Sequence, residues 1–178
     1  MSARDLADNR AASPAGGMRA PAGSWGDLAI AVVPVVAVFA AGAIANYPNL
    51  APWYASLAKP AFNPSNWVFP TVWTVLYALM AVAVWRVLRR PASRSVRRSA
   101  LTWYFLQLAF NAAWSWLFFA LHNPLLGLAD IVPQLLLVVI TIERFRRIDG
   151  VAALCLVPLA GWVAFAALLN LEIWRLNG

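Results

Sequence analysis

Long apolar runs joined by short polar links make up most of the chain. Five of these runs are long enough, at about 20 residues each, to cross the roughly 30 Å hydrocarbon layer of a bilayer. They lie near residues 27–46, 67–88, 99–121, 125–146 and 151–174. The runs are continuous and lack the alternation of a membrane β-barrel, so helices are the expected spanning structure. The pattern therefore predicts an all-α integral membrane protein, a bundle of five transmembrane helices over residues 25–178.

The composition supports this class and sets the N-terminus apart. Of the 178 residues, 62% are hydrophobic and 12% are charged, which is too apolar for an ordinary soluble domain. Residues 1–24 are instead rich in Ala, Gly, Pro and Ser with scattered charge, and we expect a disordered tail there. The tail has no apolar stretch before Trp25, so it does not resemble a signal peptide.

Basic residues fall almost entirely on one side of the predicted bundle. Twelve of the fourteen lie in the tail, between the second and third spans (Arg86–Arg98) or between the fourth and fifth (Arg144–Arg147). With five crossings these places share one side, and only Lys59 and Arg175 lie on the other. The positive-inside rule then predicts a cytoplasmic N-terminus, with the loop before the second span and the C-terminus on the outer side. The net charge of +7 thus indicates topology, not nucleic-acid binding, with an anionic-lipid site at Arg86–Arg98 as the alternative.

A loop rich in proline and aromatic residues precedes the second span. Pro60, Pro64 and Pro70 do not continue a helix, because proline fixes φ and lacks an N–H. Five aromatic side chains give the loop flat apolar surfaces suited to a membrane interface or a planar ligand: Trp53, Tyr54, Phe62, Trp67 and Phe69. In the helix that follows, Trp73 and Tyr77 are four residues apart and share one face.

Polar groups inside the predicted spans need partners, because hydrocarbon offers none. On the third span, Gln107, Asn111, Trp114 and Phe118 form one stripe. The stripe is either hydrogen-bonding glue between helices or the wall of a ligand pocket, and the physics leaves both open. Further polar, aromatic or small positions lie on the fourth and fifth spans: Asp130, Gln134, Trp162, Ala166 and Asn170.

No conventional catalytic or metal-binding arrangement stands out in the sequence. His122 and Cys155 are the single histidine and the single cysteine, so an intrachain disulfide and a cysteine metal site are excluded. Axial ligation of haem by His122 is a minority alternative to a solvated loop histidine. Ten tryptophans are the distinctive chemistry. Those within the spans (Trp73, Trp114, Trp162) suit an aromatic cage, whereas those near span ends suit interfacial anchors.

Several motifs follow one another in a fixed order. W-Y-x-x-L-x-K-P covers residues 53–60, P-x-x-W-x-F covers 64–69, and V-W-x-x-L-Y-x-x-M covers 72–80. F-N-x-x-W follows at 110–114, W-x-x-F-A at 162–166 and L-N-x-E-x-x-R-L-N at 169–177. In these motifs, over residues 28–177, the sequence resembles the tryptophan-rich sensory protein / translocator protein family, also called the TspO/MBR or peripheral-type benzodiazepine receptor family.

The resemblance implies a five-helix membrane protein, usually a homodimer, that binds tetrapyrroles such as protoporphyrin IX and haem. It implies no obligatory cofactor and a regulatory or transport role in tetrapyrrole and stress physiology. Matching positions imply a pocket lined by Trp73, Asn111, Trp114, Phe118, Trp162 and Ala166, with Tyr77 on the same helix face as Trp73. Trp53, Trp67 and Phe69 would belong to its lid. We also expect the Trp73 indole to donate a hydrogen bond to Asn111.

Two other functions stay open at this point, a light-dependent porphyrin-degrading enzyme and a sterol or lipid translocator. Leu171 breaks the cholesterol motif of animal family members, and Leu159 replaces a frequent tyrosine. Ala61 and Phe62 stand where some bacterial relatives carry tryptophans, which speaks against degradation if those indoles perform it. Trp116 replaces a proline of the third helix, so we expect a change of helix geometry there.

Overall fold

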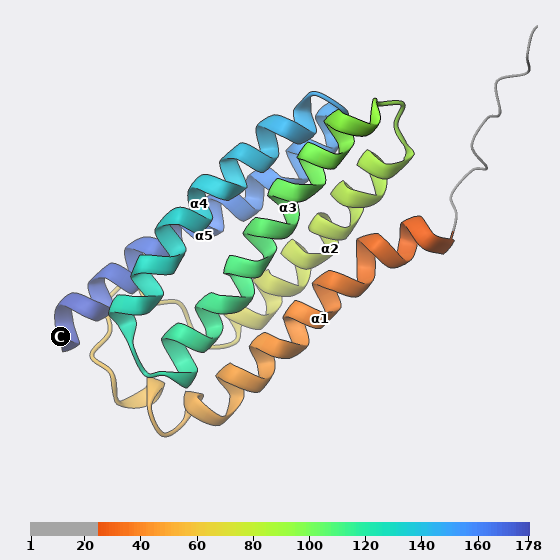
Figure 1. Ribbon diagram of the computed structural model, residues 1–178. Helices are drawn as coiled ribbons and strands as arrows, with labels where there is room; N and C mark the ends of the chain where they lie inside the picture. The colour runs from red at the N-terminus through yellow and green to blue at the C-terminus, as the bar shows by residue number, and fades with distance from the viewer. Residues whose placement is uncertain (1–24) are drawn as a thin grey trace, which may run out of the picture.

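The structure, a computed structural model, describes residues 25–178, and the predicted disordered tail over residues 1–24 lies outside them. Within this range five long helices run side by side (Figure 1). They are α1 (Trp25–Leu50), α2 (Val68–Arg89), α3 (Arg94–Ser115), α4 (Pro124–Arg146) and α5 (Gly150–Asn177). A short 3-10 helix, η2 (Tyr54–Ser56), and a π-helical turn, η3 (Trp116–Ala120), complete the elements. The predicted all-α bundle of five helices is confirmed, with bounds close to those expected.

Four of the helices are apolar enough to cross a membrane. In the described residues, α1, α2, α4 and α5 meet this condition by length and composition. α3 differs because its first turns carry Arg94, Arg97 and Arg98 and its later turns carry further polar side chains. It nevertheless packs along α4 and against α1, so it runs within the bundle beside the other helices (Figure 1). Its polar side chains Gln107 and Asn111 are buried inside the bundle, where lipid does not reach them.

Polar side chains in the short links fix where three helices begin. The Ser93 hydroxyl accepts a hydrogen bond from the Val96 N–H, and the Asn123 amide oxygen accepts one from Leu126 at 3.0 Å. Each satisfies one backbone donor of a helix start. α4 then has a proline in its first turn, where the missing N–H costs nothing. Asp149 caps α5 in the same way, and the tight links keep neighbouring helices antiparallel.

Small residues let the helices approach closely around the C-terminal end of α3. A side-chain carbon built on Gly42 of α1 would lie 3.3 Å from the Ser115 hydroxyl. One built on Gly127 of α4 would lie only 2.8 Å from the Asn170 amide oxygen and 3.0 Å from Phe118. Glycine at these positions therefore permits backbone-to-side-chain packing that alanine would disturb, as is usual in membrane bundles.

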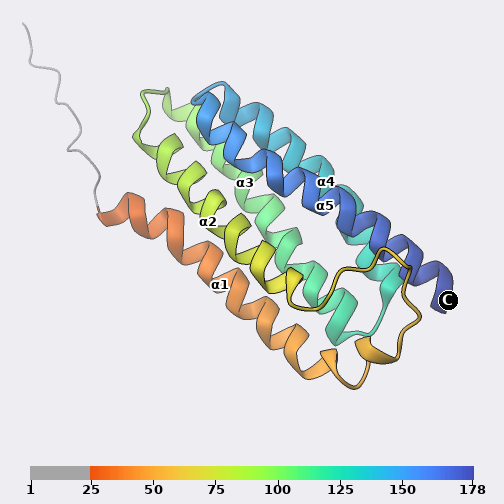
Figure 2. The same ribbon diagram turned by 180° about the vertical axis from the view of Figure 1, so that it is seen from behind.

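The first loop, residues 51–67, crosses the end of the bundle and passes the C-terminal end of α5 before it enters α2 (Figure 2). Asn177 fastens it there. The Asn177 amide accepts a hydrogen bond from the Ala58 N–H at 2.9 Å and donates one to the Ala58 carbonyl at 2.9 Å. This end of the molecule, called the loop end below, is thus closed by a segment that the last turn of α5 holds in position.

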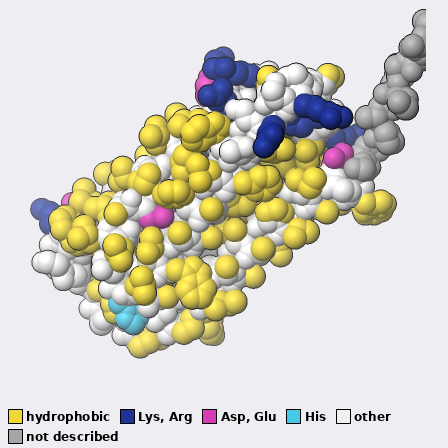
Figure 3. Space-filling model, viewed as in Figure 1, with side chains coloured by type: hydrophobic (Ala, Val, Ile, Leu, Met, Phe, Trp, Pro, Cys, Tyr) yellow, Lys and Arg dark blue, Asp and Glu magenta, His cyan; other side chains and the backbone are white. Residues whose placement is uncertain are grey.

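The opposite end carries most of the basic side chains and is called the arginine-rich end (Figure 3). Asp149 ties it together. Its buried carboxylate accepts hydrogen bonds from Arg86 at 2.9–3.2 Å, from Arg90, and from the Ala152 N–H at 2.8 Å. Burial alone would raise the pKa of Asp149, but these donors outweigh it and hold that pKa below its usual value. The last turn of α2 is thereby joined to the start of α5.

Candidate ligand-binding site

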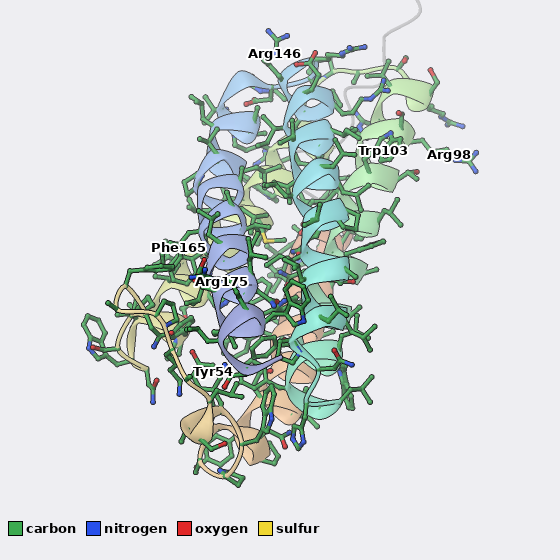
Figure 4. All side chains as sticks on the ribbon, turned by 90° about the vertical axis from the view of Figure 1, so that its left-hand side faces the viewer. Tyr54, Arg98, Trp103, Arg146, Phe165 and Arg175 are labelled. Atoms are coloured by element: carbon green, nitrogen blue, oxygen red, sulfur yellow. The ribbon has the colours of Figure 1, made fainter. Side chains whose placement is uncertain are left out.

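An aromatic cavity of about 470 Å³ lies inside the bundle toward the loop end. All five helices, η2 and the first loop contribute to its wall. Ten aromatic residues line it: Phe39, Tyr47, Tyr54, Phe69, Trp73, Tyr77, Trp114, Phe118, Phe119 and Trp162. Figure 4 shows Tyr54 near the loop end, away from Arg98 and Arg146 at the other end. A mostly apolar cavity of this size, with a few polar groups, is typical of a site for a small molecule.

The residues predicted to line a pocket meet in this cavity. Trp73 and Tyr77 come from α2, Asn111 and Trp114 from α3, and Phe118 from η3. Trp162 and Ala166 come from α5 and complete the predicted set. Asn111 and Trp114 of the α3 stripe line the cavity and also form hydrogen bonds to neighbouring helices. The stripe is therefore both a cavity wall and a link between helices. Gln107 is the exception, since it is fully buried but does not line the cavity.

The predicted lid residues have three different environments. Phe69, in the first turn of α2, lines the cavity and meets Trp162 edge to face at 5.9 Å. The Trp53 ring instead packs outside the cavity, stacked on His122 at 4.7 Å. Trp67 caps α2 and is 70% exposed, so it does not cover the cavity. Tyr54, from the same loop, is the aromatic residue that closes the loop end.

The predicted hydrogen bond from Trp73 to Asn111 is wrong. The Tyr77 hydroxyl donates to the Asn111 amide oxygen instead, at 2.6 Å. The Trp73 ring lies next to the Tyr77 ring, with centroids 5.3 Å apart and planes tilted by 31°. Helical spacing identified the correct face of α2 but not which of its polar atoms reaches α3. The pair Tyr77–Asn111 is thus the polar link between α2 and α3 in the cavity wall.

A second polar link, centred on Asn170 of α5, was not predicted. Its amide oxygen accepts a hydrogen bond from the Trp114 indole N–H at 3.0 Å, and its amide nitrogen donates to the Pro124 carbonyl at 2.7 Å. Asn170 is 1% exposed, and it joins α5 to both α3 and α4. The Trp114 ring, held by this bond, stacks on Phe118 with centroids 5.1 Å apart. In the sequence, the spacing of four between Trp162, Ala166 and Asn170 places Asn170 on the same face of α5 as the other two, but it does not indicate which residues Asn170 bonds.

Other polar groups around the cavity define where a ligand could form hydrogen bonds. Asn46 and Gln134 line the wall, and each has a buried amide atom without a partner in the described residues. The Tyr54 hydroxyl donates to Asn63 at 3.0 Å. Burial raises the pKa of Tyr54, while the hydrogen bond to Asn63 opposes that rise. Asp130 is buried on α4 but does not line the cavity.

His122, the minority haem-ligand candidate of the sequence, does not face the cavity. Its ring nitrogen Nε2 lies 2.7 Å from the Asn49 amide oxygen. The described chain also contains no group of three or more His, Cys, Asp or Glu side chains that could hold a metal ion. The groups that the cavity wall does present are aromatic rings, apolar side chains, amides and hydroxyl groups.

At Trp116 the helix changes from α to π geometry. The Leu121 N–H donates to the Trp116 carbonyl at 2.9 Å, five residues back, and this turn contains Phe118 and Phe119. Both rings are buried, Phe118 lines the cavity beside Trp114, and Trp116 itself points outward and is exposed. The geometry thus changes where the sequence departs from the family pattern, and π turns often occur at functional sites.

Fold and site together define an integral membrane bundle with an internal aromatic cavity. The TspO/MBR family model matches residues 29–175. The chain is 40% identical over 131 residues to the "Tryptophan-rich protein TspO" of Chlorobaculum tepidum, which covers 73% of this chain and 83% of that protein. It is 37% identical over 150 residues to the "Tryptophan-rich protein TspO" of Archaeoglobus fulgidus, at 84% and 96% coverage. It is 34% identical over 128 residues to the "Translocator protein" of Ovis aries, at 70% and 75% coverage. The chain therefore belongs to the TspO/MBR family.

Proposed function

We propose that this membrane protein binds a tetrapyrrole, of the protoporphyrin IX or haem type, in its aromatic cavity. The observation that carries the proposal is the cavity itself, whose wall presents three indole rings, Trp73, Trp114 and Trp162, from three helices. A porphyrin is a flat aromatic disc with apolar faces, and aromatic side chains stack on such faces or meet their edges. We further propose that binding serves a regulatory or transport role.

The polar groups of the wall suit the edge of such a ligand. Porphyrins of this type carry carboxylate groups at the rim of an apolar ring. Amide side chains such as Asn46, Asn66 and Gln134 can donate hydrogen bonds to carboxylates and are distributed around the cavity. A few placed donors in an apolar wall orient a ligand without making its burial costly. The arrangement of donors therefore favours a planar ligand that carries carboxylates over a ligand that has no polar groups.

Titration with protoporphyrin IX tests the proposal. Purified protein in detergent should show saturable quenching of tryptophan fluorescence in the dark, because three indoles would lie against the bound ring. A lack of saturation at micromolar porphyrin would overturn it. Repeating the titration under illumination separates binding from degradation, since a degrading enzyme bleaches the porphyrin absorption and a receptor does not.

A sterol or lipid translocator remains the second candidate, because one group of relatives carries the name "Translocator protein". Residues of α1 that line the cavity, such as Ala43 and Tyr47, are also exposed on the outside of the bundle. That arrangement would allow a lipid-like ligand to enter between helices. Displacement of bound porphyrin by cholesterol would favour this function, whereas unchanged quenching would exclude competition for the cavity.

The charge pattern supports a proposed orientation with the arginine-rich end in the cytoplasm and the first loop outside, in a bacterial envelope membrane. Cysteine labelling from each side of the membrane tests it, with a cysteine introduced at exposed Ser65. Labelling of that cysteine only from the cytoplasmic side would contradict the orientation. The predicted homodimer stays a prediction, which the mass of the solubilised protein tests.

A further inference from the structure

A second hollow lies at the arginine-rich end, on the outer face of α3 and away from the aromatic cavity. It is open to the surface and has a volume of about 590 Å³. Its lining comes entirely from the first turns of α3: Arg94, Ser95, Arg98, Ser99, Thr102 and Trp103. Figure 4 shows Arg98 and Trp103 together on the outer side of the bundle at this end. The hollow thus combines cations, hydroxyl groups and one indole ring.

The two arginines of this hollow are not balanced by acidic side chains. Within residues 25–178, the ion pairs of Arg86 and Arg90 with Asp149 have no counterpart at Arg94 or Arg98. Arg94 and Arg98 are four residues apart, so their like charges repel along the helix. They also lie at the N-terminal end of α3, whose dipole disfavours cations, and no acidic residue occupies the first turn. A bound anion would relieve both effects.

The groups around the two arginines fit a phosphate. The planar guanidinium fork donates two parallel hydrogen bonds to phosphate oxygens, which makes arginine a frequent phosphate ligand. Ser95 and Ser99 add hydroxyl donors on the same face. No carboxylate lines the hollow, so nothing in it repels an anion.

The same helix face continues as an apolar track, which distinguishes a lipid from a free phosphate. Below Trp103, at spacings of three and four, come Leu106 and Phe110. Leu106 is 41% exposed and Phe110 is half-buried, so this apolar face of α3 stays partly uncovered by the described residues. Trp103 ends the lining of the hollow and adjoins this track, and an indole at such a polar–apolar boundary is typical of a membrane interface.

We propose that the Arg94–Trp103 hollow binds the headgroup of an anionic phospholipid, with its acyl chains along Leu106 and Phe110. The phosphate lies between Arg94 and Arg98 and accepts hydrogen bonds from them and from the serine hydroxyls. This role differs from that of a topology signal, which needs positive charge at this end but no particular arrangement of it. It also concerns the opposite end of the molecule from the proposed tetrapyrrole site.

Lipid binding by purified protein separates the two roles. Phosphatidylglycerol and phosphatidylcholine are added in turn to delipidated protein in neutral detergent, and retained lipid is counted by native mass spectrometry. The wild type should retain phosphatidylglycerol preferentially. Arg94→Gln/Arg98→Gln should bind it at least about tenfold more weakly, because each substitution removes charge-assisted hydrogen bonds to the phosphate that the control arginines do not make. The control Arg146→Gln/Arg147→Gln removes the same charge from exposed positions at the same end.

Four outcomes would overturn the proposal. One is equal affinity for both lipids in the wild type, and another is an equal loss in the control variant, which would indicate unspecific attraction. Binding of soluble glycerol phosphate as tightly as the lipid would show that the apolar track contributes nothing. Undiminished phosphatidylglycerol binding in the Arg94→Gln/Arg98→Gln variant would place the lipid elsewhere. The melting temperature of each variant in phosphatidylcholine, expected to equal that of the wild type, guards against loss of folding.

Discussion

Replacement of Asn170 by alanine should destabilise the bundle and loosen one wall of the cavity. The substitution removes the 3.0 Å bond from the Trp114 indole and the 2.7 Å bond to the Pro124 carbonyl. The loss leaves the Trp114 indole N–H inside the protein without a hydrogen bond, whereas the Pro124 carbonyl, at the start of α4, keeps its intrahelical donor and loses only a second one. An unsatisfied buried group costs about 1–3 kcal/mol in soluble proteins, and hydrogen bonds in membrane bundles lie at the low end, so we expect about 2 kcal/mol in total.

Thermal unfolding of the detergent-solubilised protein measures this loss. At roughly 2–4 °C per kcal/mol for a chain of this size, Asn170→Ala should melt roughly 4–8 °C below the wild type. Trp114→Phe keeps a ring in the cavity wall but removes the indole donor, so it tests one of the two bonds alone. The double variant should lose less than the sum of the single losses, because both single changes remove the same bond.

Two results would refute this reasoning. If Asn170→Ala melts within about 1 °C of the wild type, the two hydrogen bonds do not stabilise the bundle at the expected level. If the losses of Asn170→Ala and Trp114→Phe add strictly, the residues act independently and the bond between them contributes nothing. In either case Asn170 would act mainly as a packing residue against Gly127, where a side-chain carbon would lie 2.8 Å from the Asn170 amide oxygen.

Three further predictions concern other links of the molecule. Tyr77→Phe and Asn111→Ala should each weaken porphyrin binding, and the double variant should lose less binding free energy than the sum, because both changes remove the same hydrogen bond. The losses from Trp73→Phe and Asn111→Ala should add, and the dissociation constants of all variants test both statements. Asn177→Ala releases the first loop, so porphyrin association and dissociation should both accelerate about fivefold in stopped-flow quenching, and unchanged rates would contradict the role of this contact. The lowered pKa of Asp149 means that its contribution to stability is present above its unfolded value of about 3.9 and is lost as the pH falls through the lower folded value. The free energy of unfolding of Asp149→Asn should therefore be about 1–3 kcal/mol lower at pH 7, and thermal unfolding of this variant should lack that part of the acid dependence.

The helices could be predicted because hydrocarbon imposes a simple rule. A spanning segment must be long, apolar and helical, so the apolar runs predicted nearly the right bounds. The third span was expected from residue 99, and α3 begins earlier, at Arg94, because its first turns are charged and do not belong to the apolar run. The cavity wall was predicted at residue level because helical spacing and motif positions together identify inward faces. Trp73, Trp114 and Trp162 were assigned to an inner cage on this basis and all three line the cavity.

Partner choice within the cavity could not be predicted, because spacing along one helix says nothing about distances between helices. Asn111 was assigned to Trp73, but the hydroxyl of Tyr77, one turn further along the same face, is the group that reaches it. The environments of the aromatic residues in the first loop were even harder to predict. Trp53 and Trp67 look alike in the sequence, yet one stacks on His122 and the other is 70% exposed, since the path of the loop depends on the remote contact with Asn177.

The central claim, that the aromatic cavity is the tetrapyrrole site, is tested most directly by a pair of variants on α5. Ala166 lines the cavity, and Leu168, two residues further on, is 61% exposed on the outside. Ala166→Phe adds a ring inside the cavity, where overfilling costs about 1–3 kcal/mol, and Leu168→Phe adds a ring outside it. In a dark titration with protoporphyrin IX, we expect Ala166→Phe to bind at least about tenfold more weakly and Leu168→Phe to bind like the wild type. Wild-type affinity in a normally folded Ala166→Phe variant would contradict the account.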